Sequence, residues 1–195
     1  MAKSIGAVNT LLRRPDGTLA GFNTDCTAAL NAIEAGLGSP LAGLTVVVVG
    51  AGGAGRAVAF GAVHRGARVL IANRNFERAK ALADAVGGIA VEWSALQEGS
   101  VRGDVLANTT SLGMLPDVES TPVPVSALSN FKLVFDAVYT PLETRLLREA
   151  RLAGARTVDG LEMFIGQAAE QFLLFTGKQA PVALMRATVL KSLLK

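Results

Sequence analysis

The sequence contains little of several residue types on which whole functional classes depend. Its 195 residues include one cysteine, Cys26, and one histidine, His64. A single cysteine excludes an intrachain disulfide and favours a reducing compartment, and this pair of residues does not make a metal site. Aromatic residues make up only 5% of the chain and include one tryptophan, Trp93, which lies in no pattern that indicates a function.

The charge of the chain is also restricted. Charged residues make up 18%, the net charge is +3, and no run of lysine or arginine occurs. This does not indicate nucleic-acid binding, whereas a small basic excess fits anionic small ligands. Half of the residues are hydrophobic, as in a soluble globular chain. The N-terminus has no signal-peptide pattern, and glycines and Arg56 interrupt the apolar stretch 44–63, so we expect an intracellular protein without a membrane span.

Residues 45–56 combine a buried strand with a glycine-rich turn. Four consecutive valines, 46–49, indicate a strand buried on both faces, as in a parallel sheet. Gly50, Gly52 and Gly55 follow at the spacing G-x-G-x-x-G and lead into a helix. Such glycines allow a tight turn, approach of the backbone to a pyrophosphate, and close packing of helix on strand. The pattern predicts dinucleotide binding at a helix N-terminus; the alternative is a glycine-rich turn in an ordinary α/β protein.

An alternation of strands and helices continues from this turn. The expected elements are strands at 45–49, 68–72, 89–91, 104–108, 133–138 and 156–158, with helices at 53–65, 76–86 and 143–153. This order is typical of an α/β protein with a Rossmann-like, doubly wound parallel sheet. Apolar spacing predicts a further helix at 161–176, and Pro181 precedes a last helix at 182–194.

The first 38 residues follow a different pattern. Residues 5–12 and 18–22 predict two strands joined by a turn, and a helix is expected at 26–36. A hairpin lacks the crossover of a parallel sheet and is marginally stable alone, so we expect it to join a sheet that these 195 residues do not contain. The expected domains are 1–38, a piece of another domain; 39–160, the dinucleotide domain; and 161–195, the C-terminal helices.

The residues after the second strand of the dinucleotide domain indicate which dinucleotide binds. An NAD site places an acidic residue about 20 residues beyond the glycines, on the ribose 2′-hydroxyl. Here Asn73, Arg74 and Asn75 follow the strand, and Arg78 lies one turn into the next helix. Guanidinium groups suit a 2′-phosphate, which a carboxylate would repel. We therefore predict NADP rather than NAD; the alternative is that both arginines are ordinary surface charges.

Seven stretches of the chain together resemble the shikimate dehydrogenase family. The residues, order and spacing of these stretches agree with that family across essentially the whole chain. The stretches are Ile-Gly-Ala-Val-Asn-Thr (5–10), Gly-Phe-Asn-Thr-Asp (21–25), Gly-Ala-Gly-Gly-Ala-Gly-Arg-Ala (50–57), Asn-Arg-Asn-x-x-Arg-Ala (73–79), Asn-Thr-Thr-Ser-Leu-Gly-Met (108–114), Phe-Asp-Ala-Val-Tyr-Thr-Pro (135–141) and Asp-Gly-Leu-Glu-Met-Phe-x-x-Gln-Ala (159–168). Residues 175–181 look closest to the plant bifunctional 3-dehydroquinate dehydratase/shikimate dehydrogenases.

The resemblance implies an NADP-dependent reduction of 3-dehydroshikimate to shikimate, on the route through chorismate to aromatic amino acids. Hydride passes between the nicotinamide and the ring C3, while a Lys–Asp pair handles the proton. The implied catalytic residue is Asp25, which also binds substrate together with Asn9, Tyr139 and Gln167. The implied cofactor residues are Gly50, Ala51, Gly52, Gly53 and Ala54 at the diphosphate, Asn73, Arg74 and Arg78 at the 2′-phosphate, and Thr109, Ser111, Ala137, Gly160 and Met163 near the nicotinamide.

The sequence also departs from this family. The family's substrate domain carries Ser-x-Ser and Asn-Val-Thr-x-Pro-x-Lys motifs; neither occurs here, and Lys3 has no such context. We therefore expect a fragment without the catalytic lysine, in which the resemblance makes 1–38 a remnant of the substrate domain and 161–195 hinge helices. This fragment is expected to bind NADP(H) but to turn over shikimate negligibly. Its expected partners are the small-molecule substrate, the missing substrate domain and, if the plant resemblance holds, a fused dehydratase domain. The compartment is then the plastid stroma, and otherwise the cytoplasm.

Two other functions and several structural roles stay open from the sequence. The chain is alternatively part of a quinate/shikimate dehydrogenase, or a non-catalytic NADP-binding module. Asp25 precedes an apolar run and is by itself a good helix N-cap. Asn9 fits a turn cap, and Gln167 fits an exposed helix position. Tyr139 either contacts ligand or rims the core, and Met163 either packs on the nicotinamide or fills the core.

Overall fold

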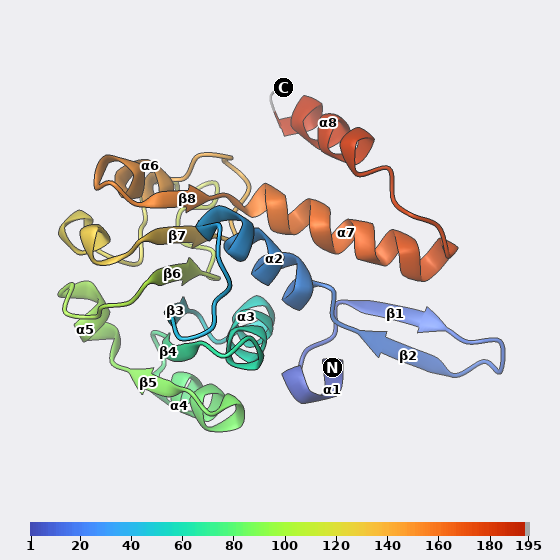
Figure 1. The fold of residues 1–195 in the computed structure, drawn as a ribbon, viewed down its shortest axis with the longest axis horizontal. Coiled ribbons are helices and arrows are strands. Elements are labelled where there is room, and N and C mark those ends of the chain that lie inside the picture. The colour runs from blue at the N-terminus through green and yellow to red at the C-terminus, as the bar shows by residue number, and fades with distance from the viewer. Residues whose placement is uncertain (194–195) are drawn as a thin grey trace.

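The computed structural model describes residues 1–193 and contains a six-stranded parallel sheet (Figure 1). The strands are β3 (Thr45–Val49), β4 (Arg68–Ala72), β5 (Ile89–Val91), β6 (Val105–Asn108), β7 (Leu133–Asp136) and β8 (Arg156–Val158). Their order across the sheet is β5-β4-β3-β6-β7-β8. The chain therefore reverses direction of winding between β3 and β6, which confirms the predicted doubly wound fold and places a ligand crevice at the carboxyl ends of these two strands.

The central strand β3 is buried because helices cover both faces of the sheet. Val46 and Val48 belong to one apolar cluster, Val47 and Val49 belong to the other, and none of the four exposes any surface. Burial of each valine side chain contributes about 1.5–3 kcal/mol. The uninterrupted run of β-branched residues is thus explained by a strand with no solvent-facing side.

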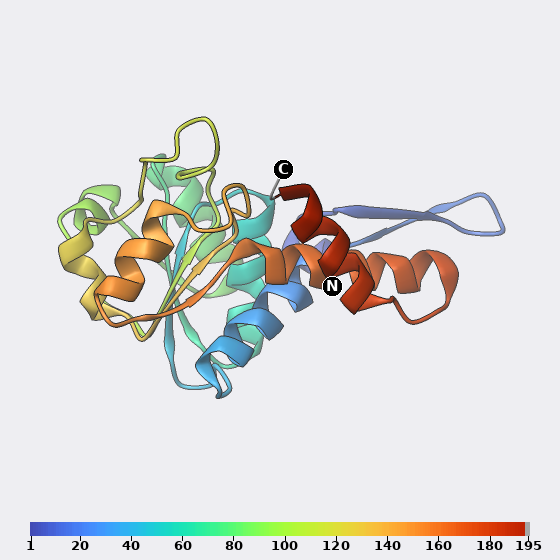
Figure 2. The same ribbon diagram turned by 90° about the horizontal axis from the view of Figure 1, so that it is seen from above.

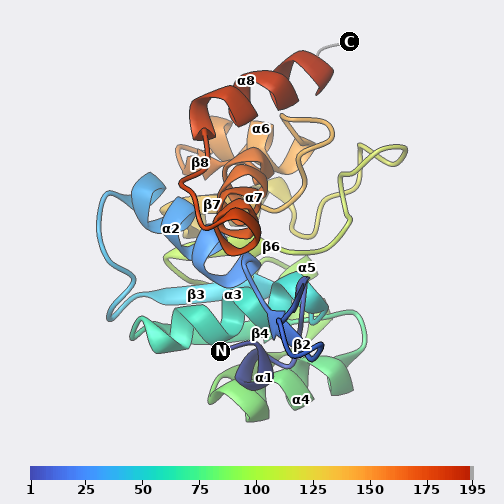
Figure 3. The same ribbon diagram turned by 90° about the vertical axis from the view of Figure 1, so that its right-hand side faces the viewer.

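The helices lie in two layers, one over each face of the sheet (Figures 1 and 3). The first layer contains α2 (Asp25–Leu37), α3 (Gly53–His64) and α4 (Phe76–Val86). The second contains α5 (Trp93–Gln97), the 3-10 helix η1 (Val125–Asn130) and α6 (Arg145–Leu152). No helix among residues 1–193 combines the length and the apolar character needed to cross a membrane.

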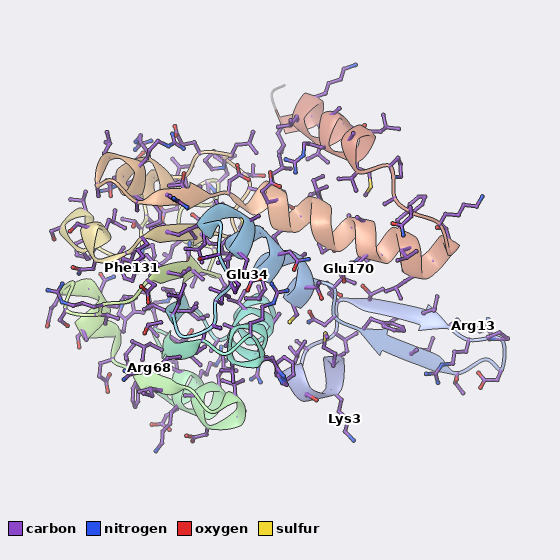
Figure 4. The ribbon with its side chains drawn as sticks, viewed as in Figure 1. Lys3, Arg13, Glu34, Arg68, Phe131 and Glu170 are labelled. Carbon is purple, nitrogen blue, oxygen red and sulfur yellow. The ribbon has the colours of Figure 1, made fainter. Side chains whose placement is uncertain are left out.

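The two ends of the chain extend beyond the sheet on the same side (Figure 2). At the N-terminus, α1 (Ala2–Ile5) precedes an antiparallel hairpin of β1 (Thr10–Arg13) and β2 (Leu19–Phe22). At the C-terminus, α7 (Gly160–Thr176) runs beside α2 and the hairpin and is followed by α8 (Val182–Leu193). Gln171 on α7 donates to the hydroxyl of Thr10 at 3.0 Å. Arg13 marks the hairpin tip, and Arg68 and Phe131 lie at the opposite end of the molecule (Figure 4).

Most expected elements are confirmed within a few residues, but two predicted strands have the wrong bounds and some short helices were missed. The strand expected over 5–12 begins only at Thr10, because Ile5 ends α1 and is buried with Cys26 and Ala57 against α3. The strand expected to reach Val138 ends at Asp136, because the Asp136 carboxylate accepts a hydrogen bond from the Val138 backbone amide. Two short elements, α5 and η1, were not predicted, since neither is long enough to show a helical period. The predicted end of the last helix at residue 194 lies outside the described residues.

A buried polar network connects β6 and β7 to the start of α6. The carboxylate of Asp136 accepts hydrogen bonds from the Asn108 side-chain amide (2.9 Å), the Val138 backbone (3.1 Å) and the Thr144 hydroxyl (2.7 Å). Asn108, Asp136 and Thr144 expose no surface. Because all three donors are neutral and water is excluded, burial raises the pKa of Asp136 to about 6. The network fixes the loops that leave both strands at the crevice.

The raised pKa of Asp136 predicts a pH-dependent stability. The folded-state pKa of about 6 lies above the ordinary value of 3.8, so the contribution of this carboxyl is present below pH 4 and is lost as the pH rises through 6. The Asp136→Asn variant has no titrating group at this position. In guanidinium titrations, the free energy of unfolding of the wild type relative to this variant should fall by about 2 kcal/mol between pH 4 and pH 7.

Asp104→Asn provides a control of opposite sign. The backbone N–H of Thr45 and the side chain of Lys132 lower the pKa of Asp104, so its contribution is present at neutral pH and is lost as the pH falls below 4. A difference between wild type and Asp136→Asn that stays constant from pH 4 to pH 7 would contradict the raised pKa of Asp136.

Candidate cofactor and substrate site

The glycine turn between β3 and α3 has the geometry that its spacing predicts. Gly50 has a φ of 107°, and its amide donates to Ala72 on β4 at 2.8 Å. A Cβ on Gly55 would overlap the carbonyl oxygen of Gly50, so α3 packs directly on the turn. A Cβ on Gly52 or Gly53 would meet no protein atom within 4 Å. The turn thus leaves open space at the N-terminus of α3, as a pyrophosphate requires.

The end of β4 holds the adjoining loop in place while leaving its arginines available. The side chain of Asn73 accepts from the Ala51 amide at 3.3 Å and donates to the Asn75 carbonyl at 2.9 Å. Asn75 in turn caps α4 by accepting from the Arg78 amide at 3.2 Å. Arg74 and Arg78 are exposed, and within residues 1–193 neither forms an ion pair with a carboxylate. Both guanidinium groups are therefore free to bind an anion.

A hollow of about 230 Å³ lies between the glycine turn, the end of β4 and the loop after β6. Its predicted members are Gly50, Ala51, Gly52, Asn73, Arg74, Thr109 and Ser111, and its unpredicted ones are Trp93, Thr110 and Leu112. Thr109 is fixed by hydrogen bonds from its amide and hydroxyl to the Val49 carbonyl, at 2.9 and 2.7 Å. Gly53 and Arg78 lie on the first turns of their helices, beside this hollow rather than in its wall.

A second hollow, of about 260 Å³, lies between α2, α3, α7 and the loop after β7. Seven predicted residues from these four elements, together with Phe164, form its wall: Asp25, Ala54, Ala137, Tyr139, Gly160, Met163 and Gln167. The ring of Tyr139 stacks on Phe164 at a centroid distance of 4.6 Å. Residues separated by more than 140 positions in the sequence are thus brought to one place.

A third hollow connects the other two along the crevice. It is lined by the loop residues 110–111 and 137–140 together with Met114. It shares Thr110 and Ser111 with the hollow at the glycine turn, and Ala137 and Tyr139 with the hollow beside Asp25. Each hollow alone is smaller than an ordinary ligand pocket, whereas the row of three suits an extended ligand such as a dinucleotide.

Asp25 does not cap its own helix, although its position at the start of α2 permitted that interpretation. The Cys26 amide is bonded instead to the side chain of Asn23 at 3.1 Å. Burial raises the pKa of the Asp25 carboxyl, and the neighbouring Asn9 amide opposes this effect. No lysine or arginine in the described part of the chain forms an ion pair with Asp25. Its carboxyl therefore faces the hollow without a cationic partner from residues 1–193.

Asn9 lies beside this hollow and supports its edge. Its side chain donates to the Thr24 hydroxyl and accepts from the Thr24 amide, both at 3.0 Å. It also accepts from the Thr10 hydroxyl at 2.9 Å. Asn9 thus connects the hairpin to the residue preceding Asp25. It is not a member of the hollow's wall, so substrate contact by Asn9 remains a prediction.

Gln167 and Met163 approach the hollow from α7. Gln167 is half-buried rather than exposed, and its amide nitrogen donates to the carbonyl of Phe164 at 3.1 Å. Its carbonyl oxygen is left available as an acceptor. Met163 packs in the core and also lines the hollow, so contact of its side chain with a nicotinamide stays a prediction.

Some wall residues could not be identified from the sequence motifs. Trp93 follows the end of β5 after one intervening residue, Glu92. Val91 at the end of β5 pairs with Ala72 at the end of β4, which brings Trp93 close to the residues after β4. The position after a strand end was a usable signal, but the three-residue strand and the short helix α5 obscured it. Phe164 had no distinguishing signal, because it continues the apolar stripe of α7.

Comparisons with known proteins agree with this geometry. The family model described as "Shikimate / quinate 5-dehydrogenase" matches residues 33–113, and "Shikimate 5'-dehydrogenase C-terminal domain" matches residues 160–190. A chloroplastic bifunctional 3-dehydroquinate dehydratase/shikimate dehydrogenase of Arabidopsis thaliana is 57% identical over 93% of this chain, which spans 32% of that protein. A shikimate dehydrogenase (NADP(+)) of Methanosarcina mazei is 46% identical over 99% of this chain, which spans 71% of that protein.

Solved structures show the same arrangement. A shikimate dehydrogenase in complex with NADP+ superposes with a TM-score of 0.90 at 34% identity, over 100% of this chain and 69% of the other. A quinate dehydrogenase from Corynebacterium glutamicum in complex with NAD gives a TM-score of 0.86 at 39% identity, over 97% of this chain and 70% of the other. Together with the sequence matches, these likenesses show that the chain belongs to the shikimate dehydrogenase family.

Proposed function

We propose that this chain is the cofactor-binding part of an NADP-dependent shikimate dehydrogenase, which reduces 3-dehydroshikimate to shikimate. The observation that carries the proposal is the row of hollows that connects Arg74 and the glycine turn to Asp25, Tyr139 and Gln167. One end of the row suits a phosphorylated adenosine and the other a small hydroxylated ring. An NADP-dependent relative at 46% identity supports both assignments.

The residues of the crevice fit the dinucleotide. Open space at Gly52 and the N-terminus of α3 suit the diphosphate, and the free guanidinium groups of Arg74 and Arg78 suit the 2′-phosphate. When bound, NADP supplies the hydride or accepts it. Met163, Gly160 and Ala137 form an apolar part of the wall of the hollow beside Asp25, where the nicotinamide would lie.

The polar side chains of the second hollow suit substrate hydroxyls. Gln167 offers a carbonyl oxygen, and Tyr139 offers a hydroxyl on a ring that Phe164 holds in place. Asp25 has a desolvated carboxyl with a raised pKa, which suits orientation of a proton-donating partner near a developing alkoxide. In this family that partner is a lysine in an Asn-Val-Thr-x-Pro-x-Lys motif, which these 195 residues do not contain.

The N-terminal hairpin supports the proposal that a substrate domain packs against this chain. Val8, Leu11 and Leu19 each expose more than half of their surface. The hairpin is a two-stranded sheet, and such a sheet is a template for further strands. Similarity to the chloroplastic plant protein favours a fused dehydratase domain and a plastid location, whereas the archaeal similarity favours a single dehydrogenase in the cytoplasm.

A quinate dehydrogenase is the second candidate, because one such enzyme superposes with a TM-score of 0.86. That enzyme was solved with NAD, whereas the position after β4 here carries Arg74 and no carboxylate. The cofactor wall thus favours the NADP-dependent shikimate dehydrogenase. Comparing turnover of quinate and shikimate by the whole enzyme distinguishes the two candidates.

Removal of one guanidinium should change cofactor preference. We expect Arg74→Ala to weaken NADP+ binding roughly ten- to one-hundred-fold, because a charged hydrogen bond to the 2′-phosphate is lost, and to leave NAD+ binding unchanged. Isothermal titration measures both dissociation constants. Arg68→Ala is the matched control, since this exposed arginine lies at the opposite end of β4. Equal weakening of NADP+ and NAD+ by Arg74→Ala would contradict a 2′-phosphate contact.

The catalytic assignment predicts that binding and turnover can be separated. The 195-residue chain should bind NADPH but reduce 3-dehydroshikimate negligibly, because Asp25 faces no lysine. A chimera carrying the substrate domain of the Methanosarcina mazei relative should reduce it, and Asp25→Asn should lower the kcat of that chimera at least one-hundred-fold. Absorbance of NADPH at 340 nm follows the reaction. Clear turnover by the unmodified chain would overturn the assignment.

A further inference from the structure

Trp93 is the one aromatic side chain in the wall of the hollow beside Arg74, among the described residues. It is the first residue of α5 and the only tryptophan of the chain. The half-buried indole packs against the core cluster that contains Val49, Ala72 and Leu96. The same side chain lines the hollow. Trp93 is therefore held by the core and also contributes aromatic surface to the wall of the hollow.

The neighbours of Trp93 determine which part of a dinucleotide reaches it. The glycine turn and Arg74 both line the hollow, and both suit phosphate groups. Apart from Asn73, the remaining wall residues are those of the loop 109–112, whose side chains are small or aliphatic, and Trp93. Trp93 is thus the wall residue that suits a planar base next to a phosphorylated ribose, because it alone in this wall carries an aromatic ring.

We propose that the Trp93 indole is the contact surface for the adenine base of the cofactor and determines affinity for the adenosine half. The inference rests on the proposed dinucleotide function. The role of Trp93 differs from that of Arg74, because adenine is common to NAD and NADP whereas the 2′-phosphate occurs only in NADP. Trp93 therefore contributes equally to the binding of both cofactors, whereas Arg74 distinguishes between them.

The test uses Trp93→Leu, which keeps an apolar side chain against the core but removes the aromatic face. A base stacked on an aromatic ring contributes about 1–3 kcal/mol, so this variant should bind NADP+, NAD+ and 2′,5′-ADP about five- to one-hundred-fold more weakly by isothermal titration. Trp93→Phe should recover most of the affinity for all three ligands. Unchanged binding of 2′,5′-ADP by Trp93→Leu overturns the inference, and so does Trp93→Phe if it binds as weakly as Trp93→Leu.

Leu96→Ala is the matched control for packing of α5. Leu96 is buried in the same cluster and is absent from the wall of the hollow. This variant should lose thermal stability yet bind 2′,5′-ADP within about twofold of the wild type. Equal weakening by Leu96→Ala and Trp93→Leu would assign the effect to α5 packing and overturn the adenine contact. If the wild type binds none of the three ligands, the proposed function itself is contradicted.

The single tryptophan provides a second readout on the unmodified chain. 2′,5′-ADP carries no nicotinamide, so a change in tryptophan emission reports on the adenosine side alone. Saturating 2′,5′-ADP should shift the emission of Trp93 and protect it from quenching by acrylamide. An emission spectrum and a quenching constant that do not change while titration calorimetry shows binding would overturn the inference.

Discussion

The packing of Gly55 against the carbonyl of Gly50 is the constraint on which the site depends. Because no Cβ intervenes, α3 begins directly over the carboxyl end of β3, and its free amides face the crevice. The parallel register then brings the ends of β4 and β6 to the same level, as Val49 pairs with both Ala72 and Asn108. This one arrangement aligns the three loops that carry the residues proposed to bind the cofactor.

The end of the crevice beside Asp25, which is proposed to bind substrate, is positioned differently. Its walls come from α2, α7 and the loop after β7, and the buried Asp136 network determines how that loop leaves the sheet. Burial of the Asp136 carboxyl among neutral donors costs stability at neutral pH, while its three hydrogen bonds hold the loops in one geometry. The two ends of the crevice therefore depend on separate structural devices, one made of glycines and one of buried polar groups.

Periodicity and glycine spacing were sufficient to predict the parallel sheet, the turn at Gly50 and the position of the two arginines just after β4, because each depends on local sequence. The register that brings Trp93 beside Arg74 could not be predicted, since β5 has only three residues. The cap of α2 could not be predicted either. The Cys26 amide donates to the side chain of Asn23 and not to that of Asp25, and the long-range contact between Asn9 and Thr24 fixes the backbone there. Tertiary contacts decided both cases.

The crevice between the glycine turn and Arg74 is proposed to bind a 2′-phosphorylated dinucleotide. The most direct measurement is a side-by-side titration of the unmodified 195-residue chain with NADP+ and NAD+ at one ionic strength. The structure predicts that NADP+ binds roughly ten- to one-hundred-fold more tightly, in keeping with the guanidinium contacts available to its extra phosphate. Tighter binding of NAD+, or equal binding of the two, would contradict the claim.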